Sequence, residues 1–330
     1  MLLRKLIEAS AVSGQEKEVR DIVRQELEGH VDSIECDSLG NVIVFKKGRK
    51  DGKKILVSAA MDEIGGIITK INSDGTLKFT KAGAFDERIL VSKIVKIGKD
   101  GLTGVIGAKP IHLQKADERK KALSVNQLYI DIGAKNKEDA EKHVKVGDYV
   151  SIWSETKDFS GNIIKGKALE SRVPCSMLIE LLKSEPEYSV YGAFTVMDKV
   201  RIFGARVAGA KVEPDCTVVL DGINTETGTA EMGKGPVVNV KELRAVFDRD
   251  FIKKVTDIAE KNGIEIQTAS DEKNITGADL YQIAAEGSKV MKLSVPCKYA
   301  YTPVNLMSSK DIEAAKKLLN AIISELGGEK

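Results

Sequence analysis

The sequence predicts an α/β fold in which a mixed central sheet is flanked by helices and carries an inserted β-barrel-like domain. Strand and helix patterns alternate in the first 65 residues and again after residue 166. Such alternation is typical of a parallel or mixed sheet covered by helices. Residues 66–166 instead carry short strand-like segments separated by turns, which favours a small barrel-like domain. The predicted domains are therefore 1–65 together with 167–330, and the insertion 66–166.

The first α/β segment is predicted to hold a helix followed by two strands. Ser13 and Glu16 have the spacing of a capping box, which predicts a helix with Ser13 as its N-cap. Apolar residues from Val19 to Leu27 then recur at helical spacing. The apolar runs Asn41–Phe45 and Ile55–Ala59 predict strands.

Similar signals define the rest of the chain. Gly66–Ile71 and Ile94–Ile97 predict strands of the insertion, and the charged run 114–121 predicts an exposed loop. The second α/β segment is predicted to hold a helix over 173–182 with Pro174 in its first turn, a strand over 191–196, a helix over 200–210, a strand over 217–220 that ends at Asp221, a helix over 250–261 capped by Asp250, a strand over 290–295 and a last helix capped by Ser308.

Composition excludes several classes of function. The net charge of +2 comes from 51 basic and 49 acidic residues that are well mixed, which argues against nucleic-acid partners and a polybasic membrane anchor. No apolar run approaches the roughly 18 residues of a membrane helix, and charges interrupt the N-terminal apolar run as no signal peptide allows. A cytoplasmic protein is expected.

None of the four cysteines has CxxC spacing, and the three histidines are far apart, so a histidine-rich metal site is hard to build.

The segment Ala60–Gly65 is the most informative stretch of the chain. It directly follows the predicted strand Ile55–Ala59, and strand ends are where open α/β sheets bind ligands. Ala60 is therefore predicted to face a crevice. Asp62 and Glu63, taken alone, are also compatible with a simple cap or turn.

A series of short motifs resembles one enzyme family over nearly the whole chain. They are Ser13–Glu16, Asp37–Asn41, Met61–Gly65, Gly104–Leu113, Asp131–Ala134, Val146–Asp148, Lys167–Leu169, Gly235–Pro236 and Glu286–Gly287. In this order they resemble the tetrahedral (deblocking, glutamyl) aminopeptidases, which are dinuclear metallopeptidases and some of which were once labelled endoglucanases. The resemblance implies a zinc-peptidase-like α/β domain, with a β-barrel-like insertion that is used in assembly.

The resemblance also implies the positions of the metal ligands, and most of them differ here. Ala60 and Tyr301 stand where the family has histidine ligands, and Glu170 stands where it has the metal-bridging aspartate. Asp198 and Lys199 stand at the family's glutamate pair, which supplies the general base and a ligand, and Thr276–Ala278 stands at its Thr-Asp-Ala segment. The family's aspartates are kept as Asp62 and Asp221. Glu170 and Asp221 alone make a weak zinc site, because zinc takes three or four protein ligands.

Lys199 places a positive charge at a metal position. A cation there is repelled by roughly 4 kcal/mol per unit charge pair at ~4 Å and an effective dielectric constant of ~20, and a dication by about twice that. We therefore hypothesise that the Lys199 ammonium occupies the place of the second metal and pairs with Glu170 or Asp198.

Three functions compete. The first is a catalytically silent or impaired homologue that acts as a structural, regulatory or peptide-binding subunit. It would bind no cofactor tightly, and it would assemble with itself or with active paralogues. The second is an active aminopeptidase that uses Zn, Co, Mn or Mg in a rearranged site, with Asp198 as base, built from the oxygen ligands Asp62, Glu63, Glu170, Asp198 and Asp221. The third, glycoside hydrolysis, needs two carboxyl groups about 5–9.5 Å apart, whereas the adjacent Asp62 and Glu63 would point apart on an extended chain.

Overall fold

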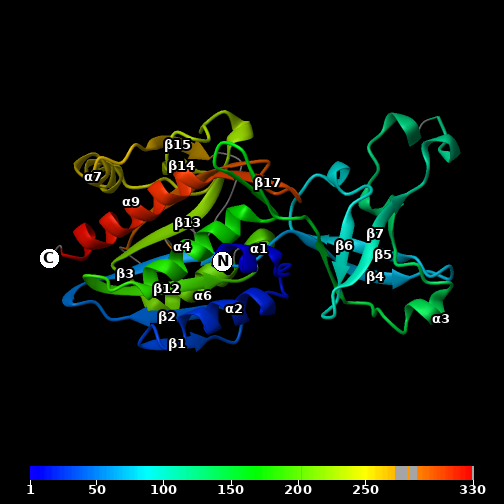
Figure 1. Cartoon of the computed structure of the whole chain (residues 1–330), viewed down its shortest axis with the longest axis horizontal. Coiled ribbons are helices and arrows are strands. Elements are labelled where there is room, and N and C mark those ends of the chain that lie inside the picture. Colours follow the sequence, from blue (N-terminus) through cyan, green and yellow to red (C-terminus); the bar gives the residue numbers. More distant parts are fainter. Residues whose placement is uncertain (117, 202, 272–280, 282–287, 329–330) are drawn as a thin grey trace.

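The structure is a computed structural model that describes residues 1–328 except 117, 202, 272–280 and 282–287. The chain forms an α/β part that holds both termini and a separate β-barrel at the other end of the long axis (Figure 1). This arrangement confirms the predicted fold class, a mixed sheet flanked by helices with a barrel inserted between two α/β segments.

Over the described residues, the large sheet has eleven strands with a parallel centre. β12, β3, β13 and β16 run parallel to one another, and antiparallel strands flank them. Along the sheet the order is β1 (Ser33–Cys36), β2 (Val42–Lys46), β12 (Tyr188–Thr195), β3 (Lys50–Ala60), β13 (Cys216–Asn224), β16 (Lys289–Lys298), β17 (Asn305–Ser308), β11 (Ile163–Gly166) and β10 (Lys157–Phe159), with β14 (Val237–Glu242) pairing with β16 and with β15 (Gln267–Asp271).

Helices cover the sheet, and apolar side chains fill the space between them. α4 packs on β3 and β13, α6 packs on β12, and α9 packs on β3 and β16. In the residues that the structure describes, the helices of this part are α1 (Leu2–Glu8), α2 (Lys17–Leu27), α4 (Leu169–Lys183), α5 (Asp198–Arg201), α6 (Phe203–Val212), α7 (Arg249–Lys261) and α9 (Ser309–Gly327), with the 3-10 turn η5 (Thr225–Thr227). No helix in the described ranges has the length and apolar character that a membrane span requires.

The barrel is closed by antiparallel pairs around its own apolar core. Its strands, in order around the barrel, are β4 (Gly65–Ile71), β5 (Leu77–Ala82), β8 (Leu128–Asp131), β7 (Leu102–Ala108), β6 (Ile94–Ile97) and β9 (Tyr149–Ile152). Short turns of helix join them: η1 (Glu87–Ile89), η2 (Ile111–Leu113), η3 (Glu118–Lys120), η4 (Val125–Gln127) and α3 (Lys137–Ala140). The predicted boundary at 166 places β10 and β11 in the insertion, whereas β11 pairs with β17 and β10 pairs with β11 at the edge of the large sheet.

The predicted capping box at Ser13 is wrong. α2 begins at Lys17, and Glu16 is its N-cap without a side-chain hydrogen bond. The Ser13 hydroxyl instead donates to Asp62 at 2.5 Å, and the Glu16 carboxylate accepts from the backbone N–H of Gly14 at 2.7 Å and of Met197 at 3.0 Å. Both side chains therefore bind tertiary partners near the strand ends.

Two other helix starts and one strand end also differ from prediction. α4 begins at Leu169 because the Asn305 side chain accepts from the Leu169 N–H at 2.9 Å, so Pro174 lies inside the helix. α7 is capped by Asp248, which accepts from Phe251 N at 2.7 Å, and Asp250 lies in its first turn. β13 continues to Asn224. The predicted cap of α9 at Ser308 is confirmed.

Glu63 joins the two parts of the molecule where the chain leaves β3 for the barrel. Its carboxylate lies 2.7 Å from Lys167 Nζ and 3.0 Å from Arg172 Nη2, and it accepts from Ser151 Oγ at 2.8 Å and Ala11 N at 3.1 Å. Burial alone would raise the pKa of Glu63, but Lys167 and Arg172 outweigh it and hold the pKa below its usual value. One carboxylate thus connects the barrel strand β9, the N-terminal segment and α4.

We predict that Glu63→Gln destabilises the whole chain, because it leaves two buried cations without an anion. The expected loss of unfolding free energy is about 3–5 kcal/mol, measured by urea unfolding near neutral pH. A carboxyl whose pKa is depressed by folding stabilises the native state above its unfolded pKa, and this contribution is lost as pH falls through the folded pKa. The difference should therefore shrink in acid.

The control is Asp257→Asn in the exposed pair Lys253–Asp257, whose side chains are 71% and 58% exposed. Exposed pairs contribute about 0–1 kcal/mol. Equal losses in the two variants would contradict the role given to Glu63.

Candidate functional site

The residues predicted to form the site come together at the carboxyl ends of the parallel strands. Ala60 ends β3 and pairs with Thr195 at the end of β12. Leu220 of β13 pairs with Ala59, so Asp221 lies beside Ala60. α5 begins at Asp198 directly after β12. The strand order therefore collects these groups at one edge of the sheet.

Glu170 reaches the same edge from the first turn of α4. A Cβ built on Gly222, which follows Asp221, would lie 2.6 Å from Glu170 Cβ, so only glycine allows the helix to approach here. Asp221 and Lys199 both act electrostatically on Glu170. Glycine at 222 thus places the Glu170 carboxylate next to Asp221.

Lys199 lies inside the site with its ammonium group buried. Its side chain is 3% exposed, and its Nζ lies 3.3 Å from Asp198 Oδ2 and 5.5 Å from the centre of the Tyr301 ring. Its backbone N–H donates to Asp62 Oδ2 at 2.8 Å. Burial opposes the charge, but Asp198 and Asp221 outweigh it and raise the pKa of Lys199 well above its usual value. The ion pair hypothesised from the sequence is made with Asp198.

The carboxyl groups around Lys199 are themselves perturbed. Burial raises the pKa of Asp198 to about 6 and raises those of Asp62 and Glu170. Among the described residues, Asp62 Oδ1 and Glu170 Oε2 are buried and have no hydrogen-bond donor. These groups therefore depend on Lys199 for much of their compensation.

Tyr301 and Ala60 offer no metal ligand of the predicted kind. Burial raises the pKa of Tyr301 well above its usual value, so the phenol keeps its proton. Ala60 presents a methyl group, and its carbonyl accepts from Cys175 Sγ at 3.2 Å. The motif positions Thr276–Ala278 and Glu286–Gly287 lie outside the described residues.

The backbone around the site is strained. Ala168, Met197, Tyr299 and Tyr301 all have positive φ angles between 52° and 61°. Non-glycine residues rarely adopt this conformation, and it persists where surrounding structure imposes it, often at functional sites. Ala168, Met197 and Tyr299 lie within two positions of Glu170, Asp198 and Tyr301, respectively, and Tyr301 is itself a predicted site residue. The positive φ angles therefore gather around the residues that line the strand ends.

The barrel also contacts this site. Gly83, at the end of β5, has φ of +103°, and a Cβ there would lie 3.5 Å from Lys199 Cβ and 3.2 Å from Ile64 Cγ2. A distance of 3.5 Å is ordinary van der Waals contact, so the barrel approaches α5 closely at the point where Lys199 leaves the backbone.

These residues do not fit the dinuclear metal centre that the resemblance implies. An ammonium group lies among the carboxylates, and the donor at one histidine position is missing. Asp221 Oδ2 lies 3.4 Å from a second ammonium, Lys292 Nζ. Glu170 and Asp221, the carboxylates at the predicted metal-ligand positions, therefore interact with positive side chains of the protein.

Sequence reasoning missed the cluster around Lys292. This lysine is fully buried in β16, 3.3 Å from Asp271, 3.4 Å from Asp221 and 3.6 Å from Glu242. The signal for it is a lysine in the middle of the apolar run 290–295, which the periodicity predicts only as a strand.

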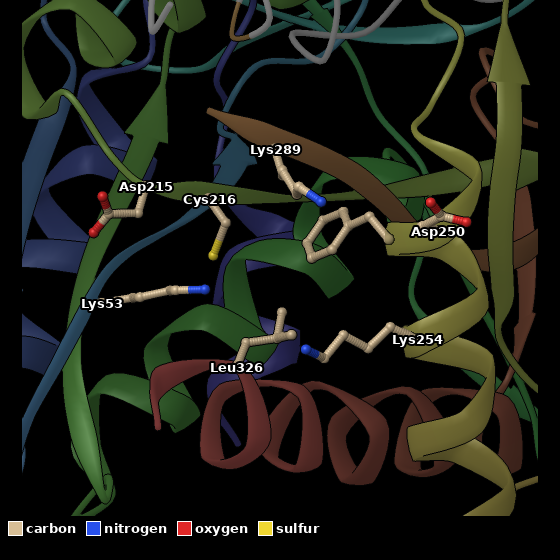
Figure 2. A pocket seen from close by; sticks show the side chains of 8 residues that line it. Lys53, Asp215, Cys216, Asp250, Lys254, Lys289 and Leu326 are labelled. Atoms are coloured by element: carbon tan, nitrogen blue, oxygen red, sulfur yellow. The ribbon is translucent and has the colours of Figure 1, made fainter. Parts of the chain in front are cut away.

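A separate hollow of about 460 Å³ lies at the amino end of β13 (Figure 2). Lys53, Lys254 and Lys289 point into it, and Cys216 lies at its wall. Burial raises the pKa of the Cys216 thiol to about 12, which leaves it unreactive. No predicted site residue lines this hollow, so it is distinct from the site at the strand ends.

Comparisons with known proteins agree with this architecture. The sequence profile of M42 glutamyl aminopeptidases matches residues 40–318. The putative aminopeptidase FrvX of Escherichia coli is 32% identical over 343 residues, covering 100% of this chain and 96% of FrvX. The TET aminopeptidase of Thaumarchaeota archaeon SCGC AB-539-E09 superposes with a TM-score of 0.94 at 30% identity, covering 99% of this chain and 97% of that one.

A third similar protein is the TET1 peptidase of Pyrococcus horikoshii, with a TM-score of 0.90 and 35% identity over 98% of both chains. That peptidase can assemble into a tetrahedron or a large octahedral shell.

We predict that Lys199→Met destabilises the chain in a pH-dependent way, because the site carboxylates lose their ammonium partner. Near pH 8 the loss should be on the order of 3–5 kcal/mol. A carboxyl whose folded pKa exceeds its unfolded value binds protons more tightly in the native state, so stability falls as pH rises through that window. Without Lys199 the pKa of Asp198 rises above its value of about 6, so the pH range in which stability is lost moves upward.

Urea unfolding at pH 5 and pH 8 measures the free energy of unfolding, and the loss caused by Lys199→Met should be smaller at pH 5. Lys253→Met, on an exposed helix face, is the control and should change little at either pH. A deficit in Lys199→Met that is the same at both pH values would rule out charge compensation by Lys199.

Proposed function

The chain belongs to the M42 glutamyl aminopeptidase family, and from this we propose that it is a hydrolytically silent member of that family. It keeps the fold and the strained backbone around the site, but it lacks the side chains that hold two metal ions. We propose that it acts as a structural, regulatory or peptide-binding subunit in the cytoplasm.

The buried ion pair of Lys199 with Asp198 is the observation that carries this proposal. A bound divalent metal supplies a Lewis acid and an activated water, and Lys199 can supply neither because its ammonium stays protonated. Asp198 stands where the general base is expected, yet it is held by the adjacent ammonium. Residues that would hold and use a metal are thus engaged with each other.

Assembly is the second part of the proposal. The TET1 peptidase of Pyrococcus horikoshii forms closed shells, and this chain has the same fold. Ile111 and Leu113, on η2 of the barrel, are 68% and 59% exposed. Exposed apolar side chains of this size favour a protein interface. We propose a homo-oligomer, or a mixed oligomer with active paralogues, in which the barrel contributes contacts.

One observation favours the second candidate, a metal-dependent aminopeptidase with a rearranged site. Asp62 Oδ1 and Glu170 Oε2 are buried acceptors without donors in the described structure. Carboxylate oxygens are ligands that Mg²⁺ and Mn²⁺ prefer. If Lys199 turned away, these oxygens would be the first available to a cation.

We predict that the purified protein, incubated with Zn²⁺, Co²⁺, Mn²⁺ or Mg²⁺ and then freed of loose ions, retains no bound metal and does not cleave short peptides. Elemental analysis and release of N-terminal residues measure the two quantities. Two tightly bound ions with turnover would establish the second candidate instead.

The matched variant restores the missing donors as Ala60→His, Lys199→Glu and Tyr301→His. We expect it to bind zinc or cobalt measurably tighter than the parent chain, because it removes one cation and adds three ligands. Circular dichroism and oligomer mass confirm its folding. If the parent and the restored variant bind metal equally, the three positions do not control metal binding.

We also predict that the protein runs in solution as a particle many times heavier than its 35.8 kDa chain. Ile111→Asp with Leu113→Asp should lower that mass, because charges in an apolar interface disfavour burial. Light scattering coupled to size exclusion measures it. Lys253→Asp on α7 is the control, and a monomeric parent chain would contradict the assembly proposal.

A further inference from the structure

The turn that carries Lys199 into the site is held by three buried side chains from other parts of the chain. Val196 and Met197 lie between β12 and α5 and belong to neither element. Three backbone N–H groups of the turn donate to side-chain oxygens: Val196 N to Asn41 Oδ1 at 3.0 Å, Met197 N to Glu16 Oε1 at 3.0 Å, and Lys199 N to Asp62 Oδ2 at 2.8 Å. The three acceptor residues are at most 3% exposed. Buried backbone donors require acceptors, and here side chains provide them.

The same turn is strained at its middle. Met197 has a φ angle of +56°, a conformation that non-glycine residues rarely adopt. Such a conformation persists where surrounding contacts impose it. Glu16 accepts from the N–H of Met197 itself, and the other two acceptors bind on either side of it. The three acceptors together therefore fix the direction in which the Lys199 side chain leaves the backbone.

Two of the acceptors close short motifs that the sequence shares with the family, and each is fixed within its own motif. In Ser13–Glu16, the Glu16 Oε1 that binds the turn also accepts from Gly14 N at 2.7 Å. In Asp37–Asn41, the Asn41 side-chain amide donates to Asp37 Oδ2 at 2.7 Å while its oxygen binds the turn. Both motifs therefore present a preset acceptor to the turn beside the site.

We propose that Glu16 and Asn41 are positioning residues, which set where the Lys199 ammonium lies by fixing the turn from which its side chain extends. Asp62 completes the arrangement, because it accepts from the N–H of Lys199. The Lys199 Nζ then lies 3.3 Å from Asp198 Oδ2 with its side chain 3% exposed. This role rests on the proposed function, in which the ammonium is the cation of the site.

A positioning role differs from general support of the fold in what its loss exposes. Loss of positioning opens one turn, whereas loss of general support loosens buried groups throughout the protein. Other lysines provide the references. Lys167 and Lys292 have side chains 6% and 0% exposed, and Lys253 is 71% exposed. The reactivity of each amine toward an acetylating reagent measures how accessible that amine is.

The test is acetylation of the folded protein by an N-hydroxysuccinimide ester, with the rate at each lysine followed by peptide mass spectrometry. In the parent chain Lys199 should react far more slowly than Lys253. In Glu16→Met the rate at Lys199 should rise about ten- to a hundredfold, the range expected when a hydrogen bond to a charged group is lost. Lys167 and Lys292 should stay protected. Glu16→Gln keeps an acceptor oxygen and should protect Lys199 again.

Two further variants complete the experiment. Asn41→Ser withdraws the acceptor from Val196 N and should expose Lys199 in the same way, so it decides the question if Glu16→Met does not fold. Asp311→Leu is the matched control. Asp311 is 1% exposed and also accepts from two backbone N–H groups, those of Gly233 at 2.6 Å and Gly235 at 3.0 Å. Its loss should leave Lys199 protected.

Protection of Lys199 in a folded Glu16→Met chain overturns the positioning role and leaves the proposed function standing. Equal exposure in Glu16→Gln and Glu16→Met also overturns it, because the acceptor oxygen then has no effect. Release of Lys167 and Lys292 along with Lys199, or release of Lys199 in Asp311→Leu, shows general loosening and rejects the role. A parent chain in which Lys199 reacts as fast as Lys253 contradicts the buried ion pair, and both proposals then fail.

Discussion

Carboxyl groups buried at the carboxyl ends of β3, β12 and β13 must be compensated by positive charge, and the rest of the site depends on how this is done. A buried carboxylate without a partner costs several kcal/mol. In the family that the sequence resembles, the resemblance implies that metal ions supply this positive charge. Here Lys199 pairs with Asp198, and Lys292 lies against Asp221. In both places the compensating cation is a side chain of the protein itself.

Glu63 shows the same requirement with the signs reversed. There, Lys167 and Arg172 are the buried cations, and one carboxylate compensates both. The network ties β9 of the barrel to α4, whose first turn carries Glu170. The side chains at the strand ends can therefore differ from those of the family while the fold stays the same. This explains how a TM-score of 0.94 to a TET aminopeptidase accompanies a site that lacks most of the ligands implied by the resemblance.

Periodicity and alternation were sufficient to predict the sheet, the barrel and most helices, because these signals are local. The burial of Lys199 was also predictable, since a cation at a metal position must find anions. The predictions failed where a distant partner displaced a local one. Ser13 binds Asp62 instead of capping α2, and α4 starts early because of Asn305. The Lys292 cluster was missed because Glu242 and Asp271 lie 50 and 21 residues away in the chain.

The most direct test of the account is a crystal structure grown with excess zinc and measured at the zinc absorption edge. The account predicts that Lys199 Nζ lies beside Asp198 and that no anomalous peak occurs among Asp62, Glu170 and Asp221. Peaks coordinated by Glu170 and Asp221, with Lys199 displaced from Asp198, would contradict it, because the metal would then have outcompeted the ammonium.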